Sequence, residues 1–105
     1  MASNPFRGTW RIAWMELWEQ DYVDMEVPGY ITFEKGGNGE FQFGLVSGEI
    51  DYRLDGPRAE FTWTGIDEMD EVSGSGHAEI VRGELLGRFH IHRGDASDFR
   101  AIKTN

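Results

Sequence analysis

His90 and His92 stand two residues apart in a segment that alternates apolar and polar side chains. Successive side chains of a β-strand point to opposite faces, so this spacing places both imidazoles on one face. His77 belongs to the segment expected to pair with theirs. Imidazoles often ligate transition metals, but Arg88 is expected beside these rings, and its charge opposes a metal ion. We therefore predict no metal site and no cofactor, and we keep His92, which lies nearest the acidic loops, as a candidate site residue.

Glu16 lies between two tryptophans, Trp14 and Trp18, at i−2 and i+2. If the strand continues without interruption, all three side chains share a face. The two indoles would then desolvate the carboxyl group and raise its pKa towards the range of a general acid or base. In that geometry Glu16 is a candidate for acid–base catalysis.

A β-bulge near Ala13 is the alternative for the same segment. It would turn Met15 and Leu17 inward and Glu16 towards water. Without the bulge, Ala13, Met15 and Leu17 form an apolar strip on the outside, which suggests a dimer interface. The oligomeric state expected from the sequence is therefore a monomer or a homodimer.

Two long connections, 19–28 and 66–75, and a shorter one, 93–97, are rich in carboxylates. In an up-and-down meander, the connections that follow alternate strands lie at the same end. One mouth is therefore expected to be acidic, and it would attract a cationic ligand or a basic partner surface. Net acidity that keeps a small protein in solution is the plainer explanation of the same residues. The carboxylates of these connections are Glu19, Asp21, Asp24, Glu26, Asp67, Glu68, Asp70, Glu71 and Asp95.

The elements that must position these residues are short segments of period-two alternation, separated by many of the 14 glycines. No stretch keeps a helical stripe, and at most one short helical turn is expected within 14–25. The fold class predicted is all-β: a single domain over residues 1–105, built as one eight-stranded up-and-down antiparallel barrel. The predicted strands are Gly8–Trp18, Gly29–Lys35, Gly39–Val46, Glu49–Leu54, Ala59–Gly65, Gly76–Val81, Glu84–His92 and Asp98–Lys103.

Hairpin geometry tests whether these strands agree on an inner face, because directly opposed residues share a face. The expected connections are Gly36-Gly37-Asn38, Ser47-Gly48, Asp55-Gly56-Pro57-Arg58 and Arg82-Gly83. The first opposes Phe33 to Phe41, and all four place large residues on one common face. The predicted inner residues are Trp10, Ile12, Ile31, Phe33, Phe41, Phe43, Ile50, Tyr52, Phe61, Trp63, Ile80, Phe89, Ile91 and Phe99.

Composition excludes several classes of function. The 105 residues carry a net charge of −9, which opposes binding to nucleic acid and to anionic membranes. Cysteine is absent, which excludes disulfides and thiol chemistry. The sequence shows no long apolar run and no basic-then-apolar leader, so we expect a soluble, cytoplasmic protein. No serine stands in a nucleophile elbow, and no glycine-rich loop precedes a helix.

The segment Gly8-Thr9-Trp10 resembles the G-x-W at the start of the first strand of lipocalins and the wider calycin group. This resemblance implies a ligand-binding barrel in which an Arg of the last strand, here Arg100, packs against the tryptophan; strand alternation instead places Arg100 outside. Longer stretches are similar to a set of small uncharacterised bacterial barrel proteins, which implies a bacterial, stand-alone barrel. Those stretches are GTWRI, MELW, FxFGxVxG, FxWxGxDExD and HxGDxSxF.

Three hypotheses for function follow. The first is a small-molecule-binding barrel with an acidic open mouth; the second is an acidic interaction module, of inhibitor, immunity or accessory type, that docks on a basic protein surface. The third is an acid–base enzyme using Glu16 or His92. A filled lumen favours the second, because eight strands leave an interior just wide enough for side chains. The candidate ligand-binding residues of the mouth are Glu16, Trp18, Asp21, Tyr22, Trp63, Asp67, Asp70, His92 and Asp95.

Overall fold

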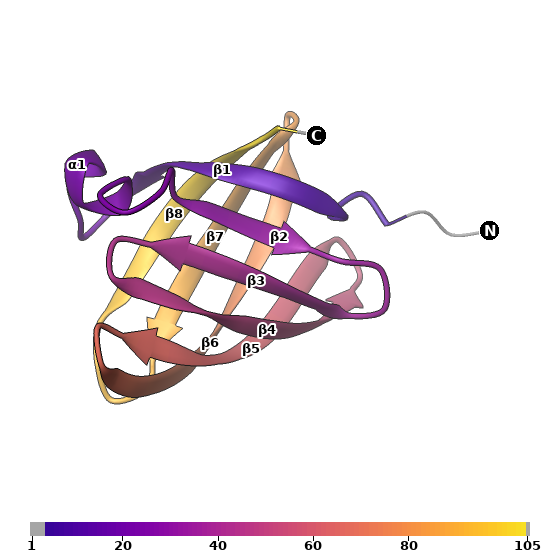
Figure 1. Cartoon of the computed structure of the whole chain (residues 1–105). Coiled ribbons are helices and arrows are strands. Elements are labelled where there is room, and N and C mark those ends of the chain that lie inside the picture. Colours follow the sequence, from indigo (N-terminus) through magenta and orange to yellow (C-terminus); the bar gives the residue numbers. More distant parts are fainter. Residues whose placement is uncertain (1–3, 105) are drawn as a thin grey trace.

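The computed structural model describes residues 4–104, and in this part of the chain its elements are eight strands and one helical turn (Figure 1). The elements are β1 (Gly8–Met15), α1 (Gln20–Val23), β2 (Tyr30–Phe33), β3 (Asn38–Phe43), β4 (Val46–Asp55), β5 (Arg58–Asp67), β6 (Asp70–Val81), β7 (Glu84–Ile91) and β8 (Ala96–Lys103).

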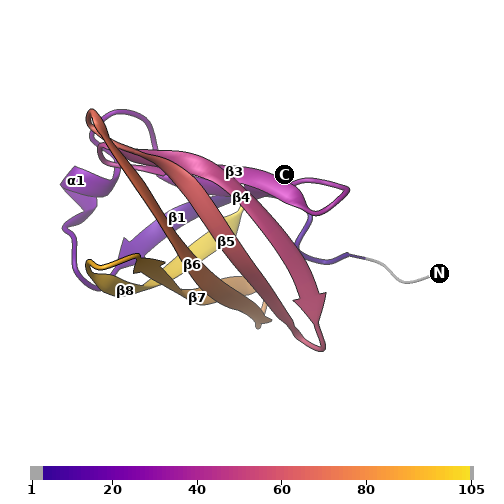
Figure 2. The same ribbon diagram turned by 90° about the horizontal axis from the view of Figure 1, so that it is seen from below.

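Each strand pairs antiparallel with the next, and β8 pairs with β1, so the sheet closes into a barrel around a common interior (Figure 2). The predicted all-β, eight-stranded up-and-down barrel with one short helical turn is confirmed. The predicted registers of β4–β5 and β6–β7 are also confirmed. Between residues 4 and 104, no helix is long and apolar enough to cross a membrane.

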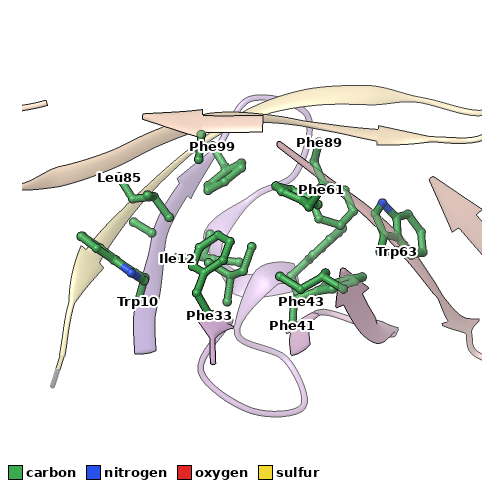
Figure 3. Close-up of a cluster of buried hydrophobic side chains, with 14 of the residues drawn as sticks. Trp10, Ile12, Phe33, Phe41, Phe43, Phe61, Trp63, Leu85, Phe89 and Phe99 are labelled. Atoms are coloured by element: carbon green, nitrogen blue, oxygen red, sulfur yellow. The ribbon is translucent and has the colours of Figure 1, made fainter. Parts of the chain in front are cut away.

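Side chains from alternate positions of every strand fill the interior (Figure 3). All the residues predicted for the inner face are buried except Ile80 and Ile91, which are partly buried against the core. Phe89 of β7 packs against several aromatic rings; its centroid lies 4.8 Å from that of Phe41 and 5.1 Å from that of Trp63. The core is therefore a continuous aromatic cluster that holds the strands at their spacing.

Glycines on the inner face stand next to the rings that fill the barrel. Gly76 of β6 pairs with Phe61 of β5, and Gly87 of β7 pairs with Phe99 of β8. A Cβ atom at either glycine would come within 2.7 Å of a ring carbon of its paired phenylalanine. Each ring thus occupies the volume that a side chain on the next strand would need, the large–small alternation that close packing requires.

Two predicted registers are wrong, each by an even number of residues. Phe33 pairs with Gly39 rather than with Phe41. The turn between β3 and β4 is Gly44-Leu45 rather than Ser47-Gly48, and the Gly44 φ of 57° is the left-handed conformation that favours glycine. Because side chains alternate with a period of two, an even shift leaves Phe33, Phe41, Phe43 and Ile50 on their predicted inner face.

The expected long loop 66–75 is instead the end of the β5–β6 hairpin. Asp67 pairs with Asp70, and Glu68 and Met69 form the turn, with a φ of 57° at Glu68. The tip of this hairpin extends beyond the packed core, and Met69 is 94% exposed. Its side chains therefore need not alternate between apolar and polar, which is why the sequence pattern does not reveal the strands there.

A shift in the β1–β8 register just before Trp14 confirms the bulge near Ala13. The bulge turns Met15 into the core and leaves Trp14 exposed on the outer face. An uninterrupted strand with Glu16 between two indoles is therefore wrong, and so is an outer strip that includes Met15. The prediction that Leu17 points inward is also wrong, because β1 ends at Met15 and Leu17 is exposed.

One end of the barrel is closed by the segment 16–29, which contains α1. Val23 of α1 is fully buried against the core. The Gly44 N–H donates to the Val23 carbonyl at 2.9 Å, and the Ile12 N–H donates to the Gly29 carbonyl at 2.8 Å. These bonds tie the segment to the β3–β4 turn on one side and to β1 on the other, so it forms a lid over this end.

The opposite end is closed by the segment before β1. Phe6 is buried there, and the Trp10 indole N–H donates to the Phe6 carbonyl at 2.8 Å. The Lys103 ammonium lies over the Trp10 ring, 4.9 Å from its centroid. Arg100 does not take that position, although the calycin resemblance implies it; Arg100 lies on the outer face, 3.3 Å from a carboxylate oxygen of Glu84.

Candidate functional site

Four connections meet at the end covered by the lid, on the left in Figure 1: residues 16–29, 44–45, 68–69 and 92–95. Their backbones are joined directly. The Glu68 N–H donates to the Leu45 carbonyl at 3.1 Å, and the next residue back, Gly44, bonds to the lid. The strand alternation therefore brings the acidic connections to one end, which we call the acidic end.

Trp18 and Tyr22 lie together in the lid, as half-buried rings. Their centroids are 6.4 Å apart, and the Trp18 centroid is 5.0 Å from that of Phe43. The Leu45 N–H donates to the Tyr22 hydroxyl oxygen at 3.3 Å, and the Tyr22 ring covers Gly44, where a Cβ atom would overlap it. These two aromatic residues thus pack inward and help to close the barrel.

Trp63 lies deeper than the other candidate residues. Its side chain is 2% exposed, and its ring centroid is 5.1 Å from that of Phe41. The indole N–H donates to the His90 carbonyl at 3.2 Å. The structure therefore places Trp63 in the core and apart from Trp18 and Tyr22 at the surface.

The carboxylates of the acidic end are almost all without a cationic partner. In the chain between residues 4 and 104, the ion pairs at this end involve Asp24, which binds Arg11, and Glu16, which lies 3.6 Å from Arg88. Arg93 is the one basic residue in the four connections, and it forms no ion pair within the same range. The carboxylates without an ion pair in this range are Glu19, Asp21, Glu26, Asp67, Glu68, Asp70, Glu71 and Asp95.

Glu16 and His92 do not form an acid–base pair. Glu16 lies on the outer face, where its carboxylate accepts the Asp98 N–H at 3.2 Å and stands 3.6 Å from the Arg88 guanidinium. His92 is exposed at the end of β7, and its backbone N–H donates to the Ser73 carbonyl at 2.7 Å. Glu16 therefore lies in an exposed ion pair and His92 is exposed, so neither residue is placed in an enclosed site.

The histidines all lie on the outer face, as the alternation predicts. A depression of about 540 Å³ across β4 to β7 contains His77 and His90, and the side chains of Thr62 and Ser75 line its floor. Burial, together with the charges of Arg58 and His90, lowers the pKa of His77. Between residues 4 and 104, no group of three or more His, Cys, Asp or Glu side chains could hold a metal ion.

Our sequence-based prediction does not include this depression, although the sequence contains a signal for it. Ser73 and Ser75 alternate with Gly74 and Gly76 along β6, so β6 carries only small side chains from 73 to 76. The signal is the small size of four successive residues, most of which the sequence pattern assigns to the connection 66–75.

Asp24 has a structural role that the sequence does not reveal, because in the sequence it is one of several carboxylates in the same connection. Its carboxylate accepts the Arg11 guanidinium N–H at 2.7 Å, the Gln20 amide at 3.0 Å and the Gly29 backbone N–H at 2.8 Å. Burial raises the pKa of Asp24, but the hydrogen bonds from Gly29 and Gln20 and the charge of Arg11 outweigh it and lower the pKa. Asp24 therefore anchors the lid rather than contributing to the free negative charge.

Replacement of Asp24 by asparagine is expected to cost about 1–2 kcal/mol of unfolding free energy near neutral pH, because bonds to a charged group are lost. The folded-state pKa is lowered, so this stabilisation is complete above about pH 5 and is lost as the pH falls through the folded pKa. Urea unfolding of the wild type and Asp24→Asn should therefore converge towards acid pH. Asp21→Asn, an exposed neighbour, is the control and should show no such pH-dependent difference.

The interior leaves no room for a ligand. The void lined by Ile12, Met15, Ile31, Phe41, Phe89 and Phe99 cannot hold a water-sized molecule. At the acidic end, a surface depression of about 390 Å³ is lined by the consecutive residues 13–20. A drug-sized molecule is normally enclosed by a pocket that buries most of its surface, and neither space does this.

Comparisons of the chain with models of protein families, with curated proteins and with solved structures give no match. The calycin resemblance and the resemblance to small bacterial barrel proteins therefore stay predictions.

Proposed function

We propose that this protein is an interaction module that binds a basic surface of a partner protein through its acidic end. The observation that carries the proposal is the set of eight carboxylates there that have no ion pair within residues 4–104. On the outer faces of β4 to β8, arginines and carboxylates form pairs, as in Arg88–Asp98 at 2.8 Å and Arg53–Glu60 at 3.4 Å. The five other carboxylates without an ion pair within residues 4–104 are spread over β3, β4 and the β2–β3 loop: Glu34, Glu40, Glu49, Asp51 and Asp55. Charge left unpaired at one end attracts and orients an oppositely charged protein.

Exposed apolar side chains among these carboxylates support the same function. Met69 projects from the tip of the β5–β6 hairpin, and Leu17, Met25 and Val27 of the lid are also exposed. Methionine is enriched in protein interfaces, where apolar contacts are surrounded by a polar rim. The filled interior and the closed ends argue against the alternative, a barrel that encloses a small molecule.

The test uses a synthetic lysine- and arginine-rich peptide as the probe, with the same peptide carrying glutamate in place of the basic residues as its counterpart. Titration calorimetry at low salt should show binding of the basic peptide and none of the acidic one. Raising the ionic strength shortens the Debye length from about 30 Å at 0.01 M to about 8 Å at 0.15 M. The affinity for the basic peptide should therefore fall as the ionic strength rises.

The combined variant Asp67→Asn, Asp70→Asn, Glu71→Gln localises the binding. Each exposed ion pair contributes about 0.2–1 kcal/mol, so the three changes together should weaken binding about tenfold. The matched control is Glu34→Gln, Glu49→Gln, Asp51→Asn, which changes the net charge equally on exposed positions of the β2–β3 loop and β4. An equal loss of affinity in both variants would contradict a site at the acidic end, because net charge alone would then explain the binding.

A further inference from the structure

The outer face of β1, β8 and β7 carries apolar side chains that the barrel itself does not use. Trp14, Val81, Leu86 and Ile102 are between 39 and 46% exposed. Trp14 pairs with Arg100 of β8, which pairs with Leu86 of β7, so these two apolar residues flank one arginine in a single row. We call these four residues the apolar patch.

A second row lies beside the first and continues the patch. Ile102 of β8 pairs with Glu84 of β7, and Glu84 pairs with Val81 of β6. Neighbouring rows on one face of a sheet are close enough for large side chains to touch. The four apolar residues therefore form a contiguous surface over β1, β8, β7 and the end of β6, rather than single exposed residues.

The bulge in β1 is the reason that a tryptophan belongs to this surface. Trp10 and Ile12 face the core, and an unbroken strand would place Trp14 there as well. The register shift after Ile12 sends Trp14 outward and gives its core position to Met15. The core is filled without Trp14, so the indole is left free for an intermolecular contact.

The charges within the patch balance. Arg11, Arg100, Glu79 and Glu84 occupy the positions between the apolar residues, and they are two positive and two negative groups. The opposite outer face differs, because Glu40 of β3 directly opposes Glu49 of β4. With a net charge of −9 per chain, two copies repel each other strongly through the acidic end and through β3–β4. The balanced charges of the apolar patch avoid this repulsion.

We propose that the apolar patch docks on the same patch of a second copy of this chain, forming a two-fold symmetric dimer. Such an interface is self-complementary, so a neutral surface with alternating charges can exchange ion pairs across the axis. A standard interface takes about 800 Å² from each partner, roughly an eighth of the 6408 Å² surface of this chain. The outer face of three strands can supply that area, and the acidic ends of both copies remain free.

Sedimentation velocity from micromolar to millimolar concentration tests the proposal on the whole chain. The wild type should reach twice the 12.0 kDa mass of one chain. Leu86→Glu and Leu86→Arg should each weaken dimerisation at least a hundredfold. Leu86→Glu makes the net charge more negative and Leu86→Arg makes it less negative. A loss of dimerisation in both variants therefore shows that the apolar surface, rather than the net charge, holds the dimer together. Far-UV circular dichroism of each variant checks that the barrel is retained.

The matched control is Ile66→Glu, which introduces the same group at a comparably exposed position of β5, outside the patch. It should leave the dimer intact. A wild type that stays monomeric at millimolar concentration overturns the proposal, and so does a dimer that survives both Leu86 variants. Neither result bears on peptide binding at the acidic end, because no residue of the apolar patch is one of the eight carboxylates proposed to bind the peptide.

Discussion

Phe89→Ala is expected to lower the unfolding free energy by about 3–5 kcal/mol, the usual cost of removing a buried phenylalanine ring. Such a loss is a large part of the total stability of a small domain, which is about 5–15 kcal/mol. The reason is the position of the ring, which packs against aromatic residues of two other strands, β3 and β5. Those residues are Phe41, Phe43, Phe61 and Trp63.

Urea unfolding followed by tryptophan fluorescence measures this change, because Trp63 lies beside Phe89 in the core. Phe89→Leu should cost clearly less, since leucine fills more of the space than alanine. Ile66→Ala, at an exposed position of β5 outside the apolar patch, is the control and should change stability by less than about 1 kcal/mol. A loss for Phe89→Ala as small as that of the control would mean that the interior is not packed as described.

Gly76→Ala is expected to destabilise the barrel by about 1–3 kcal/mol, although it adds only a methyl group. A Cβ atom there would stand 2.6 Å from the Arg88 carbonyl oxygen of β7 and 2.7 Å from a ring carbon of Phe61 in β5. Backbone cannot yield as a flexible side chain does, so the strands must separate or the ring must leave its position. Either response opens the packed interior.

A double-mutant cycle with Phe61→Leu separates the two contacts. Removing the ring should reduce the cost of Gly76→Ala, because the clash with β5 is relieved while the clash with β7 remains. Gly94→Ala provides the control, since its nearest neighbour is a side-chain carbon of Ile91 at 3.2 Å in a turn. Its effect should stay within about 0.5 kcal/mol. If the changes in unfolding free energy caused by Gly76→Ala and Phe61→Leu are additive, the Phe61 ring does not occupy the space that a side chain at position 76 would need.

The inward and outward faces of the strands are predictable from the sequence because they depend on local alternation. Phe33, Phe41 and Phe43 keep their predicted inner face even though both hairpin registers that contain them are wrong. The same local rule puts His90 and His92 outside and brings the acidic connections to one end. Closure of the barrel follows, because no helix is available to cover the apolar face.

The exact pairing of strands is not local, since it depends on how turns fit against distant segments. Gly44 forms the β3–β4 turn beneath the ring of Tyr22, which belongs to the lid. The β5–β6 hairpin extends through Asp67 and Asp70 because β4 continues alongside it as far as Val46. The alternation of apolar and polar residues carries no information about either contact, so the sequence predicts neither of them.

Period-two alternation and net charge can be read residue by residue, so they predict an acidic, eight-stranded barrel with an aromatic inner face. The full interior, the closure of the acidic end by the lid that Asp24 anchors, and the outward position of Trp14 are known only from the folded chain. These outcomes depend on volumes and hydrogen bonds shared between segments far apart in the chain. The position of Trp14 in turn determines which surface a second copy can meet.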